Sequence, residues 1–225
     1  VIGGAGSIGS WTVKELVKYS PKTIHIVDLS ENSLVEIIRD YRSSSFSSRH
    51  PCLPAGRLSE VEGSSTIKEI EEFKTFPIDY GSINMLRFLN VREPYDFVMN
   101  FAALKHVRSE KDVATLLQMV DVNVAKMDQF VYWLVENNKC KKYFAVSTDK
   151  AANPVNFMGA SKRMMEHVIF NCGGKMAVTS SRFANVAFSN GSLLEGFLHR
   201  INKKQPISLP EKTKRFFITL EEAAQ

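Results

Sequence analysis

An acidic and a basic side chain stand next to each other in the segment "STDKAANPVNFMGASK", which covers residues 147–162. Asp149 and Lys150 follow a short apolar run, so we expect them at a loop just beyond a strand. An adjacent acid and base can donate one proton and accept another when neighbouring groups tune their pKa values. The same two residues are also typical of a surface ion pair, which contributes little to stability. The segment therefore indicates either acid–base chemistry or a solvated pair at a strand end.

A glycine-rich turn stands at the start of the chain, where "VIGGAGSIGS" contains Gly3, Gly6 and Gly9. Glycines in such a turn let the backbone approach a pyrophosphate closely, and the following helix offers its N-terminal N–H groups to the phosphates. Asp28 closes the next β-rich run, where the dinucleotide-binding fingerprint places an acidic residue for the ribose. The pattern predicts NAD as cofactor, because Asp28 would repel a 2′-phosphate. NADP and a role of Asp28 as a helix cap stay open.

Short β-rich apolar runs alternate with longer helical patterns, which is typical of βαβ units on a parallel sheet. The predicted fold class is α/β, a Rossmann-like doubly wound parallel sheet flanked by helices, with ligands at the carboxyl ends of its strands. We predict strands at 1–2, 23–27, 73–76, 97–101, 143–146 and 177–183, and helices at 10–19, 33–42, 83–89, 113–137 and 157–170.

Residues 1–225 are predicted to form a single NAD-binding Rossmann-like domain. Within it, the Ser-rich segment 43–72 is interpreted as a loop insertion with a short helix near 66–72. Residues 186–225 are interpreted as the start of a smaller C-terminal substrate-binding part that is largely missing. The chain begins without Met and stops within a helical pattern, so we expect a fragment of a longer protein.

Composition excludes several classes of function. The 225 residues are 44% hydrophobic, which suffices for one substantial core, and a net charge of +5 with interleaved acidic residues disfavours a nucleic-acid surface. The basic clusters at 139–142 and 212–215 predict either solvated ends or contacts with a polyanionic small molecule. Three dispersed cysteines and five dispersed histidines predict no disulfide framework and no metal site, in a reducing cytoplasm. The longest apolar run, 130–135, is too short to cross a bilayer, and no signal peptide is recognised.

Four motifs together resemble extended short-chain dehydrogenases/reductases: the glycine turn, "NFAALKHV", "STDKAANP" and "RFANVAFSNGS". More narrowly, "ALKHV" and "STDKAANP" resemble the UDP-N-acetylglucosamine 4,6-dehydratase subgroup of polysaccharide biosynthesis proteins. The resemblance covers nearly the whole chain apart from 43–72. It implies an NAD-dependent hydro-lyase that takes a hydride from C4 of the sugar, eliminates water across C5 and C6, and returns the hydride to C6. The implied product is a UDP-4-keto-6-deoxy sugar for bacterial surface polysaccharide.

The resemblance also assigns roles to single residues. It implies Asp149 as the acid for water loss at C6 and Lys150 as the base at C5, with Thr148 and Lys162 beside them. The implied cofactor contacts are Gly3, Gly6, Ser7, Ile8, Gly9, Asp28, Asp79, Ala102, Ala103, Lys105, Asn123 and Lys162. The implied substrate contacts are Lys105, His106, Ser147, Asn153, Asn185 and Arg215. Asp79 stays open as a turn residue, and His106 as a structural histidine.

Position 158 departs from the family pattern. Most short-chain dehydrogenases have a tyrosine four residues before the helix lysine, whereas this chain has Met158 before Lys162. A methionine cannot move a proton. Some members of the subgroup look similar in having Met there, so the proton would pass to Asp149, Lys150 or an ordered water. A slow or altered reaction, a nucleotide-sugar 4-epimerase, and binding without turnover are the alternatives, although an epimerase depends heavily on the absent tyrosine.

The helical pattern over 113–137 repeats aromatic and Met residues at helical spacing, which predicts core or subunit interface rather than a ligand site. In relatives, this helix and the one at 157–170 form a dimer's four-helix contact. The resemblance therefore implies a homo-oligomer with a UDP-sugar as its small-molecule partner, without nucleic acid and without membrane insertion. Residues 188–207 are expected either to order over the nucleotide or to contain a simple turn.

Overall fold

The computed structural model describes residues 1–46, 70–105, 110–209, 212 and 214–225. Most of the predicted insertion at 43–72, and His106, therefore lie outside the described residues. The edges of the insertion differ from the prediction. Helix α2, Glu31–Phe46, continues into its first residues, and strand β2, Glu72–Pro77, begins at its last. The part of the expected helix at 66–72 that is described, residues 70–72, is not helical.

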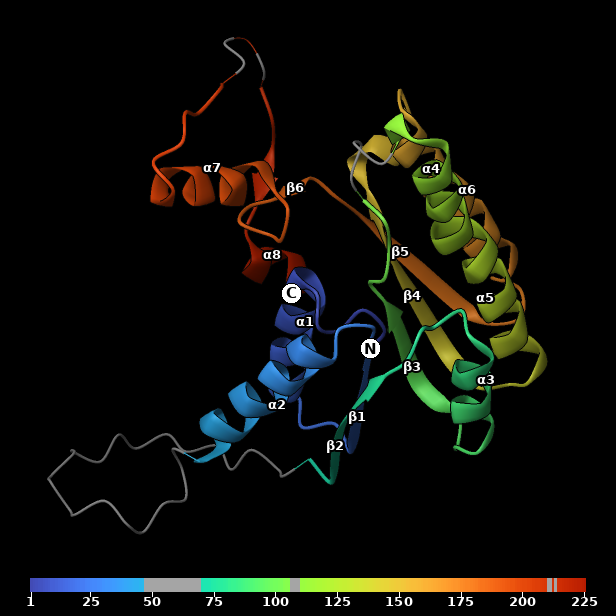
Figure 1. Cartoon of the computed structure of the whole chain (residues 1–225). Coiled ribbons are helices and arrows are strands. Elements are labelled where there is room, and N and C mark those ends of the chain that lie inside the picture. Colours follow the sequence, from blue (N-terminus) through green and yellow to red (C-terminus); the bar gives the residue numbers. More distant parts are fainter. Residues whose placement is uncertain (47–69, 106–109, 210–211, 213) are drawn as a thin grey trace, which may run out of the picture.

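Parallel strands run through the middle of the molecule (Figure 1). Strand β1, Thr23–Asp28, pairs with β2, and β4, Cys140–Thr148, pairs with both β3, Tyr95–Asn100, and β5, Ala177–Phe183. Ile2 joins the two groups, because it bridges Val27 on one side and Asn100 on the other. The order is thus β2, β1, Ile2, β3, β4, β5, with the first segment of the chain at the centre. This is the doubly wound α/β sheet that the alternating pattern predicts.

Helices cover both faces of this sheet (Figure 1). Helix α1, Ser7–Val17, and α2 pack on β1 and β2 around Val13, Ile26 and Leu34. The larger core lies on the other face, under the helices α3, Ile83–Asn90, α5, Lys126–Glu136, and α6, Phe157–Asn171. Its largest fully buried side chains include Tyr143 and Phe130. Each face is apolar because parallel strands are covered on both sides.

The helix expected at 113–137 is interrupted. Helix α4, Val113–Val120, and α5 are joined by a π-turn at Asp121–Ala125, in which one extra residue widens the helix. The Tyr80 hydroxyl donates a hydrogen bond to the Val122 carbonyl of this turn. Asn123, in its middle, is buried. The turn thus faces the chain segment that follows β2 and brings a polar side chain into the core.

The C-terminal residues form a small substructure beyond β5. Strands β6, Asn185–Val186, and β7, Phe217–Ile218, pair in parallel, and helix α7, Leu193–Asn202, lies between them in the chain. Helix α8, Leu220–Ala224, begins with a capping box and packs against α1. Figure 1 shows this group near the start of α1, on the side of the carboxyl ends of the strands. Helix α7 is new relative to the sequence prediction.

Two classes of feature are not seen in the described part of the chain. No helix there is both long enough and apolar enough to cross a bilayer. No three His, Cys, Asp or Glu side chains within those ranges gather in an arrangement suited to a metal ion.

Candidate functional site

The glycine turn packs backbone against backbone just before the N-terminus of α1. Gly3 has a φ of +67°, and a Cβ there would lie 2.6 Å from the Ala102 nitrogen. A Cβ on Gly9 would lie 2.3 Å from the Gly3 carbonyl oxygen, so the helix touches the turn directly. Gly6 is the N-cap of α1 and would bring a Cβ no nearer than 3.3 Å to the Gly3 oxygen. The backbone shape therefore fits a pyrophosphate at this helix N-terminus, with Ser7 and Ile8 in the first turn.

Asp28 ties the glycine turn to the end of β1. One carboxylate oxygen accepts a hydrogen bond from the Ala5 nitrogen at 3.0 Å, and the other accepts from the Ser30 nitrogen at 3.0 Å. Asp28 thus ties together the glycine turn and the entry to α2. Each carboxylate oxygen carries two lone pairs, so these contacts leave capacity for a ribose hydroxyl.

Asp79 follows β2, and its carboxylate binds a lysine at the start of α5. Its carboxylate accepts from Lys126 Nζ at 2.7 Å and from the Gly81 nitrogen at 2.9 Å. Burial alone would raise the pKa of Asp79, but these two hydrogen bonds hold it below its usual value. The structure therefore shows the turn role of Asp79, while an adenine contact stays a prediction.

The segment after β3 is fixed by two buried amides. Asn100 accepts from the Ala102 nitrogen at 2.9 Å through its side-chain oxygen. Asn123 donates to and accepts from the backbone of Leu104, each at 2.9 Å, and also donates to Ser161 Oγ at 3.1 Å. Residues 102–104 are thereby clamped between the π-turn and α6. Asn123 thus binds the backbone of this segment, while the cofactor contact implied for it stays a prediction.

Lys105 ends the described part of this segment, and its side chain is exposed. The nearby protein lowers the pKa of Lys105 through partial desolvation, and the negative charge of Glu195 opposes that shift. Glu195 belongs to α7, so the C-terminal substructure lies near enough to act on the charge of Lys105.

Asp149 and Lys150 meet in a 3-10 turn, Asp149–Ala151, at the carboxyl end of β4. Lys150 Nζ lies 3.0 Å from Asp149 Oδ1, and Thr148 Oγ1 donates to the same oxygen at 2.9 Å. Burial alone would raise the pKa of Asp149, but hydrogen bonds from Lys150 and Thr148 lower it below its usual value. Asp149 and Lys150 therefore form an ion pair that is partly open to solvent, and their acid–base role stays a prediction.

Helix α6 presents Met158 and Lys162 beside this turn. Met158 is 6% exposed, and its backbone nitrogen donates to Glu110 Oε1 at 2.7 Å. Lys162 is 5% exposed, and its Nζ donates to the Val146 carbonyl at 2.9 Å. Burial lowers the pKa of Lys162 from 10.5 to about 8, and the charge of Glu166 opposes that shift. Lys162 is therefore a buried amine close to the end of β4.

Ser147 points into the protein. It is 4% exposed, and its hydroxyl donates to Glu166 Oε1 at 2.6 Å. Arg182 binds both oxygens of the same carboxylate, at 2.8 Å and 2.6 Å. Neither Glu166 nor Arg182 is found by the sequence reasoning. The available signal is the position of Glu166 four residues after Lys162, on the buried face of an amphipathic helix.

The remaining predicted substrate contacts fall into two places. Asn185 donates through Nδ2 to the Phe216 carbonyl at 3.1 Å, so it lies close to Arg215 across the β6–β7 pair. Arg215 is exposed. Asn153 is also exposed and follows the 3-10 turn that carries Asp149.

A loop from the C-terminal substructure contacts the start of α1, next to the glycine turn. The Asn190 nitrogen donates to Ser7 Oγ at 2.7 Å, and Ser7 is the first residue of α1. Phe188 and Gly191 in this loop have φ of 56° and 73°. The left-handed region is uncommon for a residue such as Phe188, so the loop is held in a specific conformation.

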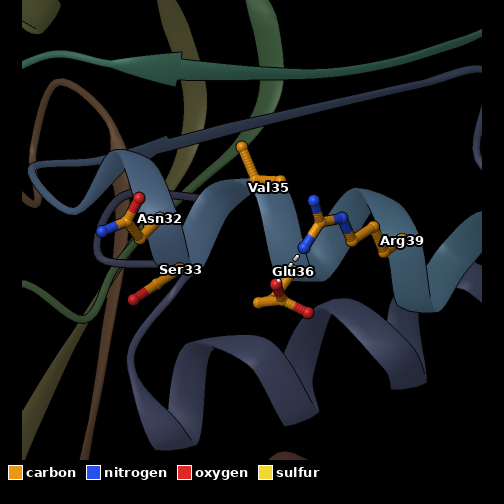
Figure 2. A pocket seen from close by; sticks show the side chains of 5 residues that line it. All are labelled: Asn32, Ser33, Val35, Glu36 and Arg39. Carbon is orange, nitrogen blue, oxygen red and sulfur yellow. Dashed lines mark hydrogen bonds and ion pairs between the residues drawn. The ribbon is translucent and has the colours of Figure 1, made fainter.

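Two surface hollows lie elsewhere. Figure 2 shows the side chains that line one of them, on α2, where Arg39 and Glu36 form an ion pair. The other, of about 470 Å³, lies between α1 and α2 over Phe73. Neither is lined by Asp149, Lys150 or Lys162, so neither is the site of the predicted chemistry.

Comparison with known sequences places the whole chain in one group. The polysaccharide biosynthesis protein family matches residues 1–225. An uncharacterized membrane protein of Methanocaldococcus jannaschii is 31% identical over 100% of this chain and 60% of its own length. The capsular polysaccharide biosynthesis protein CapD of Staphylococcus aureus is 29% identical over 100% of this chain and 34% of its own length. A UDP-glucose 4-epimerase of Rickettsia typhi is 30% identical over 56% of this chain and 38% of its own length.

Solved structures share the fold. Pen from Bacillus thuringiensis superposes with a TM-score of 0.76 at 23% identity, over 99% of this chain and 61% of its own. WbmF from Bordetella bronchiseptica, in complex with NAD⁺ and UDP, gives 0.69 at 18% identity, over 99% of this chain and 65% of its own. The chain thus spans 60% or less of the length of the sequence relatives named above and under two thirds of these two structures.

Proposed function

We propose that this chain, which belongs to the polysaccharide biosynthesis protein family, carries the cofactor-binding and catalytic part of a nucleotide-sugar 4,6-dehydratase. The proposed substrate is UDP-N-acetylglucosamine, and residues 186–225 would begin the part that binds it. One observation carries the proposal. Asp149 and Lys150, 3.0 Å apart, stand at the carboxyl end of β4, next to the helix that bears Lys162. Ligands bind at that edge of a doubly wound sheet.

The cofactor in this proposal is NAD, held by the glycine turn, Asp28 and the segment 102–105. The tight contacts of Gly3 and Gly9, and the open face at Gly6, fit a dinucleotide. Bound there, NAD would supply reversible hydride transfer, from C4 of the sugar and back to C6, without net reduction. The two carboxylate oxygens of Asp28 give the ribose an acceptor and disfavour a 2′-phosphate.

The acid–base pair would supply both proton transfers of the elimination. A ketone at C4 acidifies the C5 proton, so a base must remove that proton while an acid protonates the departing C6 hydroxyl. The resting pair is charged, with a lysine donating to a carboxylate. When a bound sugar excludes water, desolvation favours the neutral pair, and one proton passes from Lys150 to Asp149. That single transfer leaves a free amine for C5 and a carboxylic acid for C6.

The C4 hydroxyl proton has no tyrosine to accept it, because Met158 occupies that position. We propose that an ordered water takes it, directly or relayed through Asp149 or Lys150, and carries it to solvent, so that the pair keeps the protons it needs for the elimination. Both Thr148 and Lys150 donate to the same Asp149 oxygen, Oδ1. Among the described contacts, Oδ2 is therefore the oxygen that can face the substrate.

A nucleotide-sugar 4-epimerase is the second candidate, because the Rickettsia relatives named UDP-glucose 4-epimerase are 30% identical over 131 residues. An epimerase removes and restores hydrogen at C4 alone. It has no use for an acid–base pair at C5 and C6, and it relies on the position that Met158 occupies. These two features favour the dehydratase.

The test uses the full-length protein with UDP-N-acetylglucosamine in deuterated water, followed by mass spectrometry and proton NMR. We expect loss of one water, solvent deuterium at C5 and no net NADH. The C5 coupling pattern then shows whether that centre is inverted. A product of unchanged mass would instead identify an epimerase. Unchanged substrate, with binding shown by saturation-transfer signals, would identify a protein that holds the nucleotide-sugar without converting it.

Exposed apolar side chains on α4, α5 and α6 support a homo-oligomer as a further part of the proposal. They are Val113, Leu117, Tyr132, Met164 and Phe170. Light scattering of the full-length protein, with Leu117→Asp as the variant, tests this. A dimer that the variant converts to monomer is the expected result.

A further inference from the structure

The helix α6 touches the end of β4 at a regular spacing. A Cβ on Gly159 would lie 2.8 Å from the Lys150 carbonyl oxygen, so the helix backbone packs directly on the 3-10 turn. Lys162 donates to the Val146 carbonyl, and Glu166 accepts from Ser147. Residues three and four apart on a helix lie on one face, so a single face of α6 follows the chain from β4 into the turn.

The last of these contacts is a closed network of charged and polar groups. Ser147 and Arg182 are register partners on β4 and β5, and both reach the same Glu166 carboxylate. The Glu166 side chain is 6% exposed, whereas that of Arg182 is 40% exposed. Hydrogen bonds from Arg182 and Ser147 lower the pKa of Glu166, against the opposing effect of burial. A buried carboxylate with three charge-assisted or hydroxyl hydrogen bonds has a well-defined geometry.

We propose that Glu166, fixed by Arg182 and Ser147, is a positioning residue that sets where the Thr148–Asp149–Lys150 turn stands relative to α6. This inference rests on the proposed function, because it concerns the turn that carries the acid–base pair. Ser147 then serves as the anchor just before the reactive turn and not as a contact for sugar hydroxyls. Glu166 and Arg182 act through this anchor and touch neither substrate nor cofactor.

Two kinds of measurement separate positioning from general stability. Hydrogen exchange of the amides at 148–152, followed by mass spectrometry without substrate, reports how firmly the turn is held. The split of kcat and KM reports whether the reactive groups or the binding contacts are disturbed. Urea unfolding of each variant gives the global stability for comparison. All are done on the full-length protein.

Ser147→Ala is the mildest variant, because it leaves the Glu166–Arg182 pair intact. We expect exchange at 148–152 to be about tenfold faster and kcat to fall about tenfold, with KM changed less than about twofold. The matched control is Ser180→Ala. Ser180 donates to the Ala145 carbonyl at 2.8 Å, two residues before Arg182 on β5, without reaching α6. It should leave exchange and kcat unchanged.

Glu166→Gln keeps the size of the side chain and removes its charge, and Arg182→Lys keeps the charge but not the two-pronged contact. We expect both to loosen the turn, Glu166→Gln more strongly. Glu166, on the same helix, acts on Lys162 through its negative charge, and Arg182 binds that carboxylate. Removing the Glu166 charge should move the basic limb of the pH–rate profile to lower pH. That shift would report the effect of the Glu166 charge on Lys162, and the positioning role is judged by exchange and by the split of kcat and KM.

The inference is overturned if Ser147→Ala raises KM while exchange at 148–152 stays at the natural rate, since Ser147 would then contact substrate. It is also overturned if Ser147→Ala and Ser180→Ala change exchange equally. The exchange experiment needs no turnover. A full-length protein without dehydratase activity would therefore refute the proposed function and still leave the positioning role decided by exchange.

Discussion

Two turns hold polar groups at the edge of the sheet by different means. One is the glycine turn, and the other is the 3-10 turn, Asp149–Ala151, between β4 and α6. The glycine turn is shaped by its backbone, since Gly3 and Gly9 leave no space for a Cβ and Asp28 binds backbone N–H groups. The 3-10 turn is shaped by side chains. Thr148 and Lys150 bind Asp149 within it, and Lys162 and Glu166 of α6 bind the end of β4 just before it. Damage to the first should act through fold and cofactor affinity, and damage to the second through rate.

The largest expected effect is at the side-chain region. Lys150→Ala and Asp149→Asn should each lower kcat by about a hundredfold or more, because each removes one partner of a paired proton transfer. NAD affinity, measured by calorimetry, should stay within about twofold, since neither side chain shapes the glycine turn. If turnover survives either change, the assignment of the chemistry to this pair is wrong.

The next effect belongs to the backbone region. Gly9→Ala should lower the free energy of unfolding by about 1–3 kcal/mol, because its Cβ meets backbone atoms that cannot turn aside. NAD affinity should fall with it, as followed by urea unfolding and calorimetry. Gly6→Ala is the matched control for stability, since its nearest contact is at 3.3 Å. Equal destabilisation by both variants would show that the tight contact at Gly9 is unimportant.

A pH experiment sharpens the contrast, because Lys162 carries a cost in stability. Its pKa falls from 10.5 to about 8 in the folded chain. Between those values the unfolded chain holds a proton that the folded chain has released, so the free energy of unfolding rises with pH in that window. Lys162→Met should flatten this rise and be more stable than the natural protein by about 2 kcal/mol at neutral pH. Urea unfolding at several pH values, without cofactor, checks this; parallel pH curves would contradict it.

The smallest effect concerns the hydrogen bond between Asn190, in the C-terminal substructure, and Ser7, at the start of α1. Ser7→Ala removes the acceptor of the Asn190 N–H bond, which is exposed, so NAD affinity should fall by about threefold at most. Faster hydrogen exchange at 188–192 in the NAD-bound protein would accompany it. Ser10→Ala, one helical turn further on, is the control, because Ser10 Oγ donates locally to the Ser7 carbonyl.

The same contrast explains what the sequence predicts well. The glycine turn depends on the spacing of its glycines and on Asp28 at a strand end, and both are local signals. The structure has them at the expected edge of the sheet. The alternation of strands and helices is likewise local, and it yields the doubly wound sheet. The Asp149–Lys150 pair is adjacent in the chain, so its proximity needs no tertiary information.

Features that depend on distant partners are missed. Nothing near Ser147 indicates that Glu166, itself held by Arg182, will accept its hydroxyl hydrogen bond, and the resemblance implies that Ser147 contacts the sugar. The π-turn within the expected helix at 113–137 arises from tertiary contacts of Val122 and Asn123. Helix α7 has a local signal, Ser192 followed by Glu195, which is typical of a helix start. The Asn and Gly just before it conceal that signal by resembling an ordinary turn.

The π-turn at Asp121–Ala125 connects the two ends of the predicted cofactor site. Asn123 within it grips the segment on the predicted nicotinamide side, and Lys126 directly after it grips Asp79 on the predicted adenine side. A regular helix with one residue fewer would rotate the later contacts by about 100° relative to the earlier ones. The two ends of the predicted site therefore depend on the same π-turn, so a redesign of cofactor preference at one end must take the other end into account.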